Sequence, residues 1–104
     1  MTRPDLSVSR RVVAEMVTRA AGDVAGVARI GHAGPIWRRV IAGPAVRIMK
    51  QDDRVTVRIV LVARPGTSLG SLTRAVREVV DDTLERLLDL RVTTIDVVVD
   101  GVGD

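Results

Sequence analysis

Residues 69–102 read LGSLTRAVREVVDDTLERLLDLRVTTIDVVVDGV, and this stretch decides the fold class. Its first part spaces apolar residues three or four apart, the period of an amphipathic helix from Leu69 to Leu88; they are Leu69, Leu72, Val76, Val80, Leu84 and Leu87. From Val92 to Val99 apolar and polar residues alternate instead, as in a half-buried strand. A long helix followed directly by a strand predicts a domain of mixed α and β structure.

Upstream of this stretch the sequence predicts one helix and two strands. Ser9 is the expected N-cap of a helix with a stripe from Val12 to Ala20, ending near Gly22 or Val24. The segments Ala45–Lys50 and Arg54–Ala63 have strand character and are separated by a short turn at residues 51–53. In the second strand the odd-numbered residues from Val55 to Ala63 share one apolar face.

The predicted order is helix, strand, strand, helix, strand. The first two strands form an antiparallel hairpin, and the second helix returns the chain so that the last strand runs parallel to its neighbour. We therefore expect a single α+β domain over residues 1–104, with a three-stranded mixed sheet and two helices packed on one face.

Composition limits the kinds of function. The chain has 104 residues, which is enough for one core, and it contains no cysteine, so disulfides, thiolate metal sites and cysteine nucleophiles are excluded. The interior must be aliphatic, because Trp37 is the only aromatic residue apart from His32. We expect no secretory signal and no membrane span, and a cytosolic location is the simplest expectation.

Charge is distributed unevenly along the chain. Residues 1–64 hold 12 basic and 5 acidic residues, whereas residues 65–104 hold 4 basic and 8 acidic ones, and the whole chain carries +3. A basic half favours anionic partners, and halves of opposite sign equally favour head-to-tail self-association.

The Gly- and Pro-rich segment from Gly26 to Pro44 is the predicted connector, and it holds the best candidate contact residues. Within it, residues 36–41 are apolar enough to form a helical turn or to cover one end of the core. Trp37, Arg38 and Arg39 suit an interface or an acidic headgroup, because an amphipathic aromatic ring lies beside two guanidinium groups. A second candidate surface is the outer sheet face, which we expect to be wetter but to carry Val60 and Val62.

No motif predicts a reaction. His32 is the only histidine and is expected to be an exposed loop residue, so we predict no catalytic residue, no cofactor-binding residue and no metal ligand. The alternative is a KH-like RNA-binding module that uses the basic loop from Arg29 to Arg39, since Gly31-His32-Ala33-Gly34 is formally a GxxG sequence. Such a loop joins two helices in KH domains, whereas here it precedes the first predicted strand.

Both ends of the chain resemble the bacterial alkaline-shock, or envelope stress response, protein family. The matching residues are Val8-Ser9, Val12-Val13-Ala14, Val17, Ala20-Ala21, Val24-Ala25-Gly26-Val27, Val76, Val80, Leu90-Arg91-Val92 and Ile95 to Val102. The segment Gly31–Gly43 and the sequence Ala63-Arg64-Pro65 depart from the family's pattern.

The resemblance implies a non-enzymatic cytoplasmic protein linked to cell-envelope stress. Some relatives self-associate and are brought to the membrane by an anchored partner. The leading hypothesis is therefore a protein that acts through protein–protein contacts or self-assembly, without a cofactor and without a nucleic-acid partner.

Overall fold

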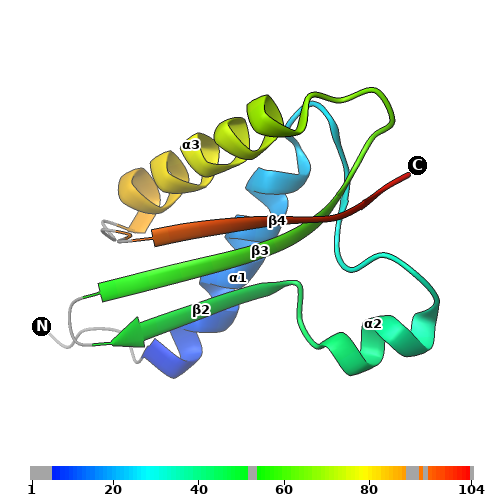
Figure 1. The fold of residues 1–104 in the computed structure, drawn as a ribbon. Coiled ribbons are helices and arrows are strands. Elements are labelled where there is room, and N and C mark those ends of the chain that lie inside the picture. The colour runs from blue at the N-terminus through cyan, green and yellow to red at the C-terminus, as the bar shows by residue number, and fades with distance from the viewer. Residues whose placement is uncertain (1–5, 52–53, 89–91, 93, 104) are drawn as a thin grey trace, which may run out of the picture.

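The computed structural model describes residues 6–51, 54–88, 92 and 94–103. The elements in chain order are α1 (Leu6–Gly22), β1 (Val27–Ile30), α2 (Ile36–Ala42), β2 (Val46–Gln51), β3 (Arg54–Ala63), α3 (Leu69–Leu88) and β4 (Thr94–Val102). Figure 1 shows α1 passing behind the sheet, α3 running alongside β4, and α2 at a distance from both helices; residues of α1 and α3 share one core with the same face of β3. The α+β class, the mixed sheet and the packing of two helices on one face are confirmed.

β3 is the centre of the sheet. β4 pairs with one edge of β3 in parallel, and β2 and β1 both pair with the other edge in antiparallel orientation. β2 covers β3 from Arg54 to Ile59, and β1 covers it from Leu61 to Ala63. The sheet thus contains four strands instead of the three predicted, but it is only three strands wide, because β1 and β2 lie end to end along the same edge of β3.

β1 and β2 meet at Val60. The N–H of Gly31 donates to the carbonyl of Val60 (2.9 Å), and the N–H of Val60 donates to the carbonyl of Ala45 (2.8 Å). In an uninterrupted antiparallel pair one residue would make both bonds. Residues 32–44, here called the excursion, therefore leave the sheet and return to it opposite a single residue, and they carry α2.

The core lies between the helices and the odd-numbered face of β3. Val57, Ile59 and Leu61 are fully buried there, as predicted. They pack against residues of both helices; these are Val13, Val17 and Ala21 from α1, and Leu72, Val76, Val80 and Leu84 from α3. Each of the valine, leucine and isoleucine side chains contributes about 1.5–3 kcal/mol by leaving water, so this shared face holds both helices against the sheet.

Three details of the local prediction differ from the structure. α1 begins at Leu6, so Ser9 lies inside the helix and is not its N-cap. A helical serine costs less than about 1 kcal/mol, which the packing of α1 outweighs. β1 was not predicted, because Val27–Ile30 lacks clear alternation and becomes a strand by pairing with the end of β3. β4 begins at Thr94, and residue 93 and the turn residues 52 and 53 lie outside the described residues.

The outer sheet face is drier than predicted. Val60 and Val62 are only 6% and 4% exposed, so the expectation of a wet surface there is wrong. The returning end of the excursion lies over Val60, and Gly103 lies close to the side chain of Val62. A contact role for these two valines stays a prediction, and in this structure little of either side chain is accessible.

Candidate contact surface

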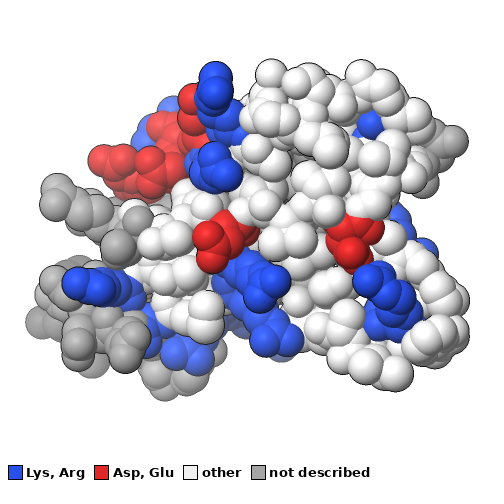
Figure 2. All heavy atoms as spheres, in the orientation of Figure 1, with Lys and Arg blue, Asp and Glu red and all other residues white. Residues whose placement is uncertain are grey.

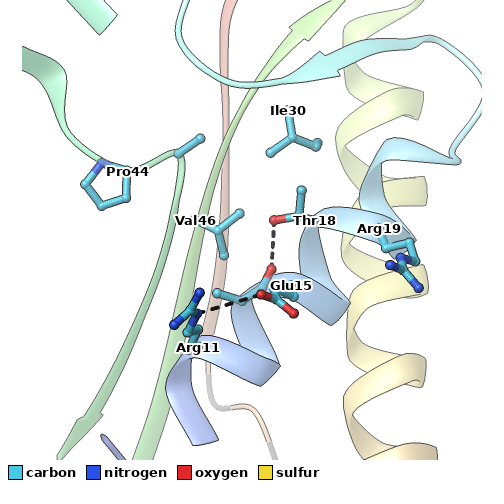
Figure 3. Close-up of a pocket in the computed structure, with 9 residues that line it drawn as sticks. Arg11, Glu15, Thr18, Arg19, Ile30, Pro44 and Val46 are labelled. Carbon is cyan, nitrogen blue, oxygen red and sulfur yellow. Dashed lines mark hydrogen bonds and ion pairs between the residues drawn. The ribbon is translucent and has the colours of Figure 1, made fainter. Parts of the chain in front are cut away.

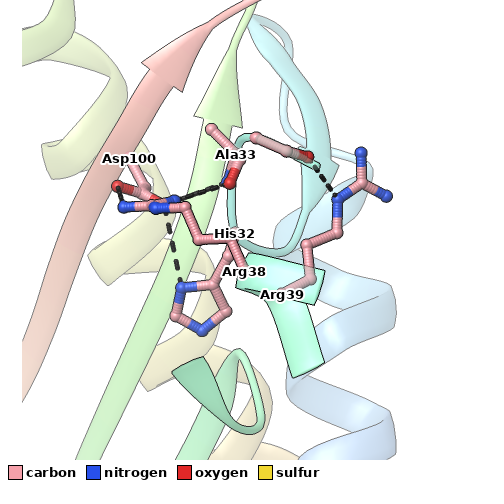
Figure 4. A network of polar contacts seen from close by, with 6 residues as sticks. His32, Ala33, Arg38, Arg39 and Asp100 are labelled. Carbon is pink, nitrogen blue, oxygen red and sulfur yellow. Dashed lines mark hydrogen bonds and ion pairs between the residues drawn. The ribbon is translucent and has the colours of Figure 1, made fainter. Parts of the chain in front are cut away.

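Asp100 on β4 ties the excursion to the sheet (Figure 4). Its Oδ2 accepts hydrogen bonds from the N–H of Ala33 (2.9 Å) and from Nη1 of Arg38 (3.0 Å), and Oδ1 accepts from Nη2 of Arg38 (3.5 Å). The two chain segments joined here are more than 60 residues apart in the sequence. We call Asp100, Ala33 and Arg38 the latch.

The sequence around Asp100 permits this close approach. Gly101 has φ +134°, and a Cβ placed on it would lie 3.0 Å from the Cβ of Ala33. A larger residue at position 101 would press against the excursion and would also be strained at this φ. Glycine at this position thus lets the loop reach the carboxylate.

The latch favours the charged forms of both its ionisable groups. The hydrogen bond from Arg38 and then that from the Ala33 N–H lower the pKa of Asp100, while its partial burial opposes them. The same hydrogen bond to Asp100 raises the pKa of Arg38. Charge-assisted bonds of this bidentate kind fix geometry as well as adding energy, so the base of α2 is held in one position.

The predicted cluster of Trp37, Arg38 and Arg39 is divided by the structure. Arg38 also donates to the carbonyl of Ala33 (2.6 Å), and Nε of Arg39 donates to the carbonyl of Gly34 (3.1 Å). Both guanidinium groups thus brace the loop that precedes α2. Trp37 takes no part in this bracing and is 65% exposed.

α2 presents its apolar residues to solvent. Ile36, Val40 and Ile41 are 74%, 76% and 79% exposed, and no residue of this helix is buried. A helical turn was one of the two expectations for this segment and is confirmed, whereas covering one end of the core is not what it does. The exposed apolar side of α2, made of Ile36, Trp37, Val40 and Ile41, is here called the α2 patch.

His32 lies differently from the expectation of an exposed loop residue. Its side chain is only 15% exposed, and Nδ1 is 3.7 Å from Oδ2 of Asp100. Its Nε2 is buried and has no hydrogen-bond partner among the described residues. Within that part of the chain no three histidine, cysteine or acidic residues come together in a way that could hold a metal ion.

A groove of about 540 Å³ runs between α1 and the interrupted edge of the sheet (Figure 3). It is lined by Arg11, Ala14, Glu15, Thr18, Arg19, Ile30, Pro44, Ala45 and Val46. Three of the four polar side chains at this groove are engaged with neighbours on α1: Arg11 pairs with Glu15 (3.9 Å), and the Thr18 hydroxyl donates to the Ala14 carbonyl (2.7 Å). The groove therefore does not gather free polar groups toward one reacting atom.

The GxxG sequence lies between β1 and α2, not between two helices. Two of the arginines that would serve an RNA backbone, Arg38 and Arg39, are bonded to the chain itself. The arrangement thus differs from that expected for a KH-like module. Of the helices that the structure describes, none is both long and apolar enough to cross a bilayer.

Sequence reasoning singled out Trp37, whose contact role stays a prediction, but it missed the latch. Arg38 and Asp100 are 62 residues apart, and no local pattern pairs them. The signal in the sequence was weak: Asp100 and Gly101 follow a run of valines, and the loop after residue 30 contains two arginines that could pair with a carboxylate.

Comparison with solved structures shows similarity to the MamM CTD. Its copper form superposes with a TM-score of 0.63 at 15% identity, covering 88% of this chain and 84% of that one. A variant of that domain in a manganese form gives a TM-score of 0.54 at 15% identity, with 88% and 96% covered. Identities this low show a shared fold alone.

No curated protein matches the chain. The model of one family does match, over residues 2–103; it is the Asp23 family, described as having a cell envelope-related function, and Asp23 is here a family name and not a residue. The resemblance drawn from the two ends of the sequence is thereby confirmed. Because the match spans nearly the whole chain, this protein belongs to the Asp23 family.

Proposed function

We propose that this protein is a non-catalytic component of the response to cell-envelope stress, and that it acts through protein–protein contacts, including self-assembly, made by the α2 patch. Membership of a family with a cell envelope-related function supports the setting. The observation that carries the contact role is the exposure of every large apolar residue of α2.

The size of the α2 patch sets what it can achieve. Full burial of its four side chains would contribute roughly 6–12 kcal/mol, taking about 1.5–3 kcal/mol for each. Association itself costs about 4–15 kcal/mol. One patch on a bare surface therefore supports only a weak complex, whereas two patches packed on each other, or one in a partner's groove, support a stable one.

The latch makes the patch more effective. Arg38 and Arg39 hold the base of α2 to the loop and to β4, so little conformational freedom is left to lose on binding. An exposed tryptophan on a rigid support is the residue type that most often dominates binding energy at interfaces. We expect Trp37 to be the dominant residue here.

Light scattering after size exclusion tests self-assembly. Wild-type protein should form a larger species as its concentration rises, and Trp37→Ala should raise the concentration needed by roughly tenfold or more. Leu87→Ala on α3 is the matched control, because Leu87 is also apolar and is 63% exposed. Contacts with other proteins can be tested in cells with a photo-crosslinking residue placed at position 37 or, as a control, at position 87. The proposal is refuted if the protein stays monomeric at every concentration and crosslinks no more often from position 37 than from position 87.

We further propose a cytoplasmic location, with a membrane-anchored protein as the route to the envelope. The protein should then sediment with native membranes but not with protein-free lipid vesicles. Trp37→Ala should release it from the membranes, and Leu87→Ala should not. Binding of the wild type to pure lipid vesicles would mean instead that the α2 patch enters the bilayer surface itself.

A further inference from the structure

A small cavity lies between the returning end of the excursion and the outer face of the sheet. Its volume is about 150 Å³, and three cationic or potentially cationic side chains line it: His32, Arg47 and Arg58. The remaining wall is formed by Ala42, Pro44 and Ala45, where the excursion returns to the sheet, and by Val60. This cavity is separate from the α2 patch, which faces solvent.

The two arginines are placed directly opposite each other. Arg47 on β2 and Arg58 on β3 are cross-strand partners, and like charges in that relation repel. Among the described residues neither forms an ion pair with a carboxylate. Asp96 on β4 is the cross-strand neighbour of Arg58, whereas the cross-strand partner of Arg47 is Arg58 itself, so Arg47 has no acidic partner across the strands. Figure 2 shows basic side chains over the middle of this face beside an acidic one.

His32 adds a polar atom that lacks a partner. In Figure 4 the imidazole turns Nδ1 toward Asp100 and its other nitrogen away from it. That nitrogen, Nε2, is buried without a hydrogen bond among the described residues. Buried polar atoms are nearly always bonded, so an unpaired one calls for an absent ligand or water.

Gly43 provides the seat for Arg47. Its φ is +84°, and a Cβ built on it would lie 2.8 Å from Nη2 of Arg47. The guanidinium group therefore rests directly on the backbone at the point where the excursion returns to the sheet. A residue with a Cβ at position 43 would be strained at this φ and would force the guanidinium group of Arg47 to shift.

We propose that this cavity binds a small oxyanion of the phosphate class. Arginine forks match the oxygen atoms of phosphate in a bidentate manner, and Nε2 of His32, when it carries a proton, supplies a further donor. The volume is far below the roughly 300–1,000 Å³ of pockets that hold drug-sized ligands, so the site takes one phosphate group and no more. The bound anion would join both ends of the excursion, through His32 and the segment that returns to the sheet, to β2 and β3.

NMR of the imidazole tests the proposal, because the chain has one histidine and its ring signals need no assignment. Inorganic phosphate should shift the His32 ring nitrogen signals saturably, and sodium chloride at the same ionic strength should not. Arg47→Gln and Arg58→Gln should each weaken binding by about tenfold or more. Arg74→Gln, which removes an exposed arginine on α3, should leave the affinity unchanged.

The outcomes separate cleanly. The proposal is overturned if chloride shifts the His32 signals as much as phosphate does, or if phosphate causes no shift. It is also overturned if the shift with phosphate is unchanged in both Arg47→Gln and Arg58→Gln. Glycerol 3-phosphate extends the test: tighter binding than inorganic phosphate would identify a phosphate monoester as the natural source, and equal or weaker binding would identify the free ion. Trp37 does not line the cavity, so the Trp37→Ala variant should bind phosphate normally. This variant therefore tests the α2 patch without affecting the test of the anion site.

Discussion

The side chain of Asp100 holds in place a loop that is more than 60 residues away from it in the sequence. A half-buried carboxylate that accepts from one backbone amide and both arms of a guanidinium is held in place by its donors. The energy of such a group depends on its charge, and its charge depends on pH. The latch should therefore respond to acid.

The first prediction concerns that response. The pKa of Asp100 is lower in the folded chain than in the unfolded chain, so the unfolded state takes up the proton first as the pH falls. The contribution of the latch is complete above about pH 5, begins to fall near the ordinary carboxyl pKa of about 3.9, and is lost once the pH drops below the folded pKa. Asp100→Asn should flatten the dependence of the unfolding free energy on pH in this window.

Urea unfolding at a series of pH values measures the effect. Asp82→Asn on α3 is the control, because Asp82 pairs with Arg86 (3.4 Å) on an exposed helix surface where such pairs contribute little. Equal flattening by the two substitutions would show that the latch has no special share in acid stability.

Two glycines give a second prediction. Gly26 has φ +97°, and a Cβ on it would lie 2.7 Å from Cγ2 of Thr67, so Gly26→Ala should destabilise the protein by about 1–2 kcal/mol or more. Gly70 has open space around it at the start of α3, so Gly70→Ala should be neutral or stabilise by at most about 1 kcal/mol. Thermal unfolding of both variants checks the opposite signs, and a stabilising Gly26→Ala would contradict the turn geometry.

At the scale of elements, the most informative feature is the interrupted edge of the sheet. Gly31 and Ala45 together make the two hydrogen bonds to Val60 that one residue would make in a continuous strand. The sheet therefore does not depend on what lies between them. β1 and β2 should be able to join into one strand in the correct register.

The third prediction follows from this register. Deleting residues 32–45 leaves Gly31 alone opposite Val60, so the shortened chain should fold cooperatively with a continuous edge strand. Deleting 32–44 leaves two residues opposite Val60 and should be less stable, because a bulge or a one-residue slip is then required. Both deletions should carry Val60→Thr, since the loss of the excursion uncovers this side chain. Urea unfolding and amide exchange in residues 46–51 distinguish them, and equal stability would refute the register argument.

The same elements show what the sequence could and could not predict. The sequence predicts five elements correctly, namely β2, β3, β4, α1 and α3. Each of them buries one row of apolar side chains, and the spacing of these residues can be recognised within the element's own sequence. β1 escapes prediction because its four residues become a strand only through pairing with Ala63, Val62 and Leu61. The latch escapes for the same reason, since it needs Arg38 and Asp100 to meet across the fold.

At the scale of the molecule, the sequence offers two ways to assemble: opposite charge in the two halves, or the apolar α2 patch. These differ in their response to salt. Exposed charges are screened once the Debye length shrinks below their separation, whereas apolar burial does not weaken with salt in this way.

The fourth prediction uses that difference. Between about 0.01 M and about 1 M salt the Debye length falls from roughly 30 Å to roughly 3 Å. Assembly through the α2 patch should persist or strengthen over this range, as measured by light scattering. Dissolution of the assembly by salt would assign it to the charged halves instead.

The placement of Trp37 has a practical consequence. The chain contains one tryptophan and no tyrosine, so its intrinsic fluorescence comes from a single indole on α2, a helix that buries none of its residues. Emission colour and quenching by iodide thus report the surroundings of α2 alone, undisturbed by other chromophores. Fluorescence of Trp37 can therefore detect the binding of a partner to α2 without an added label.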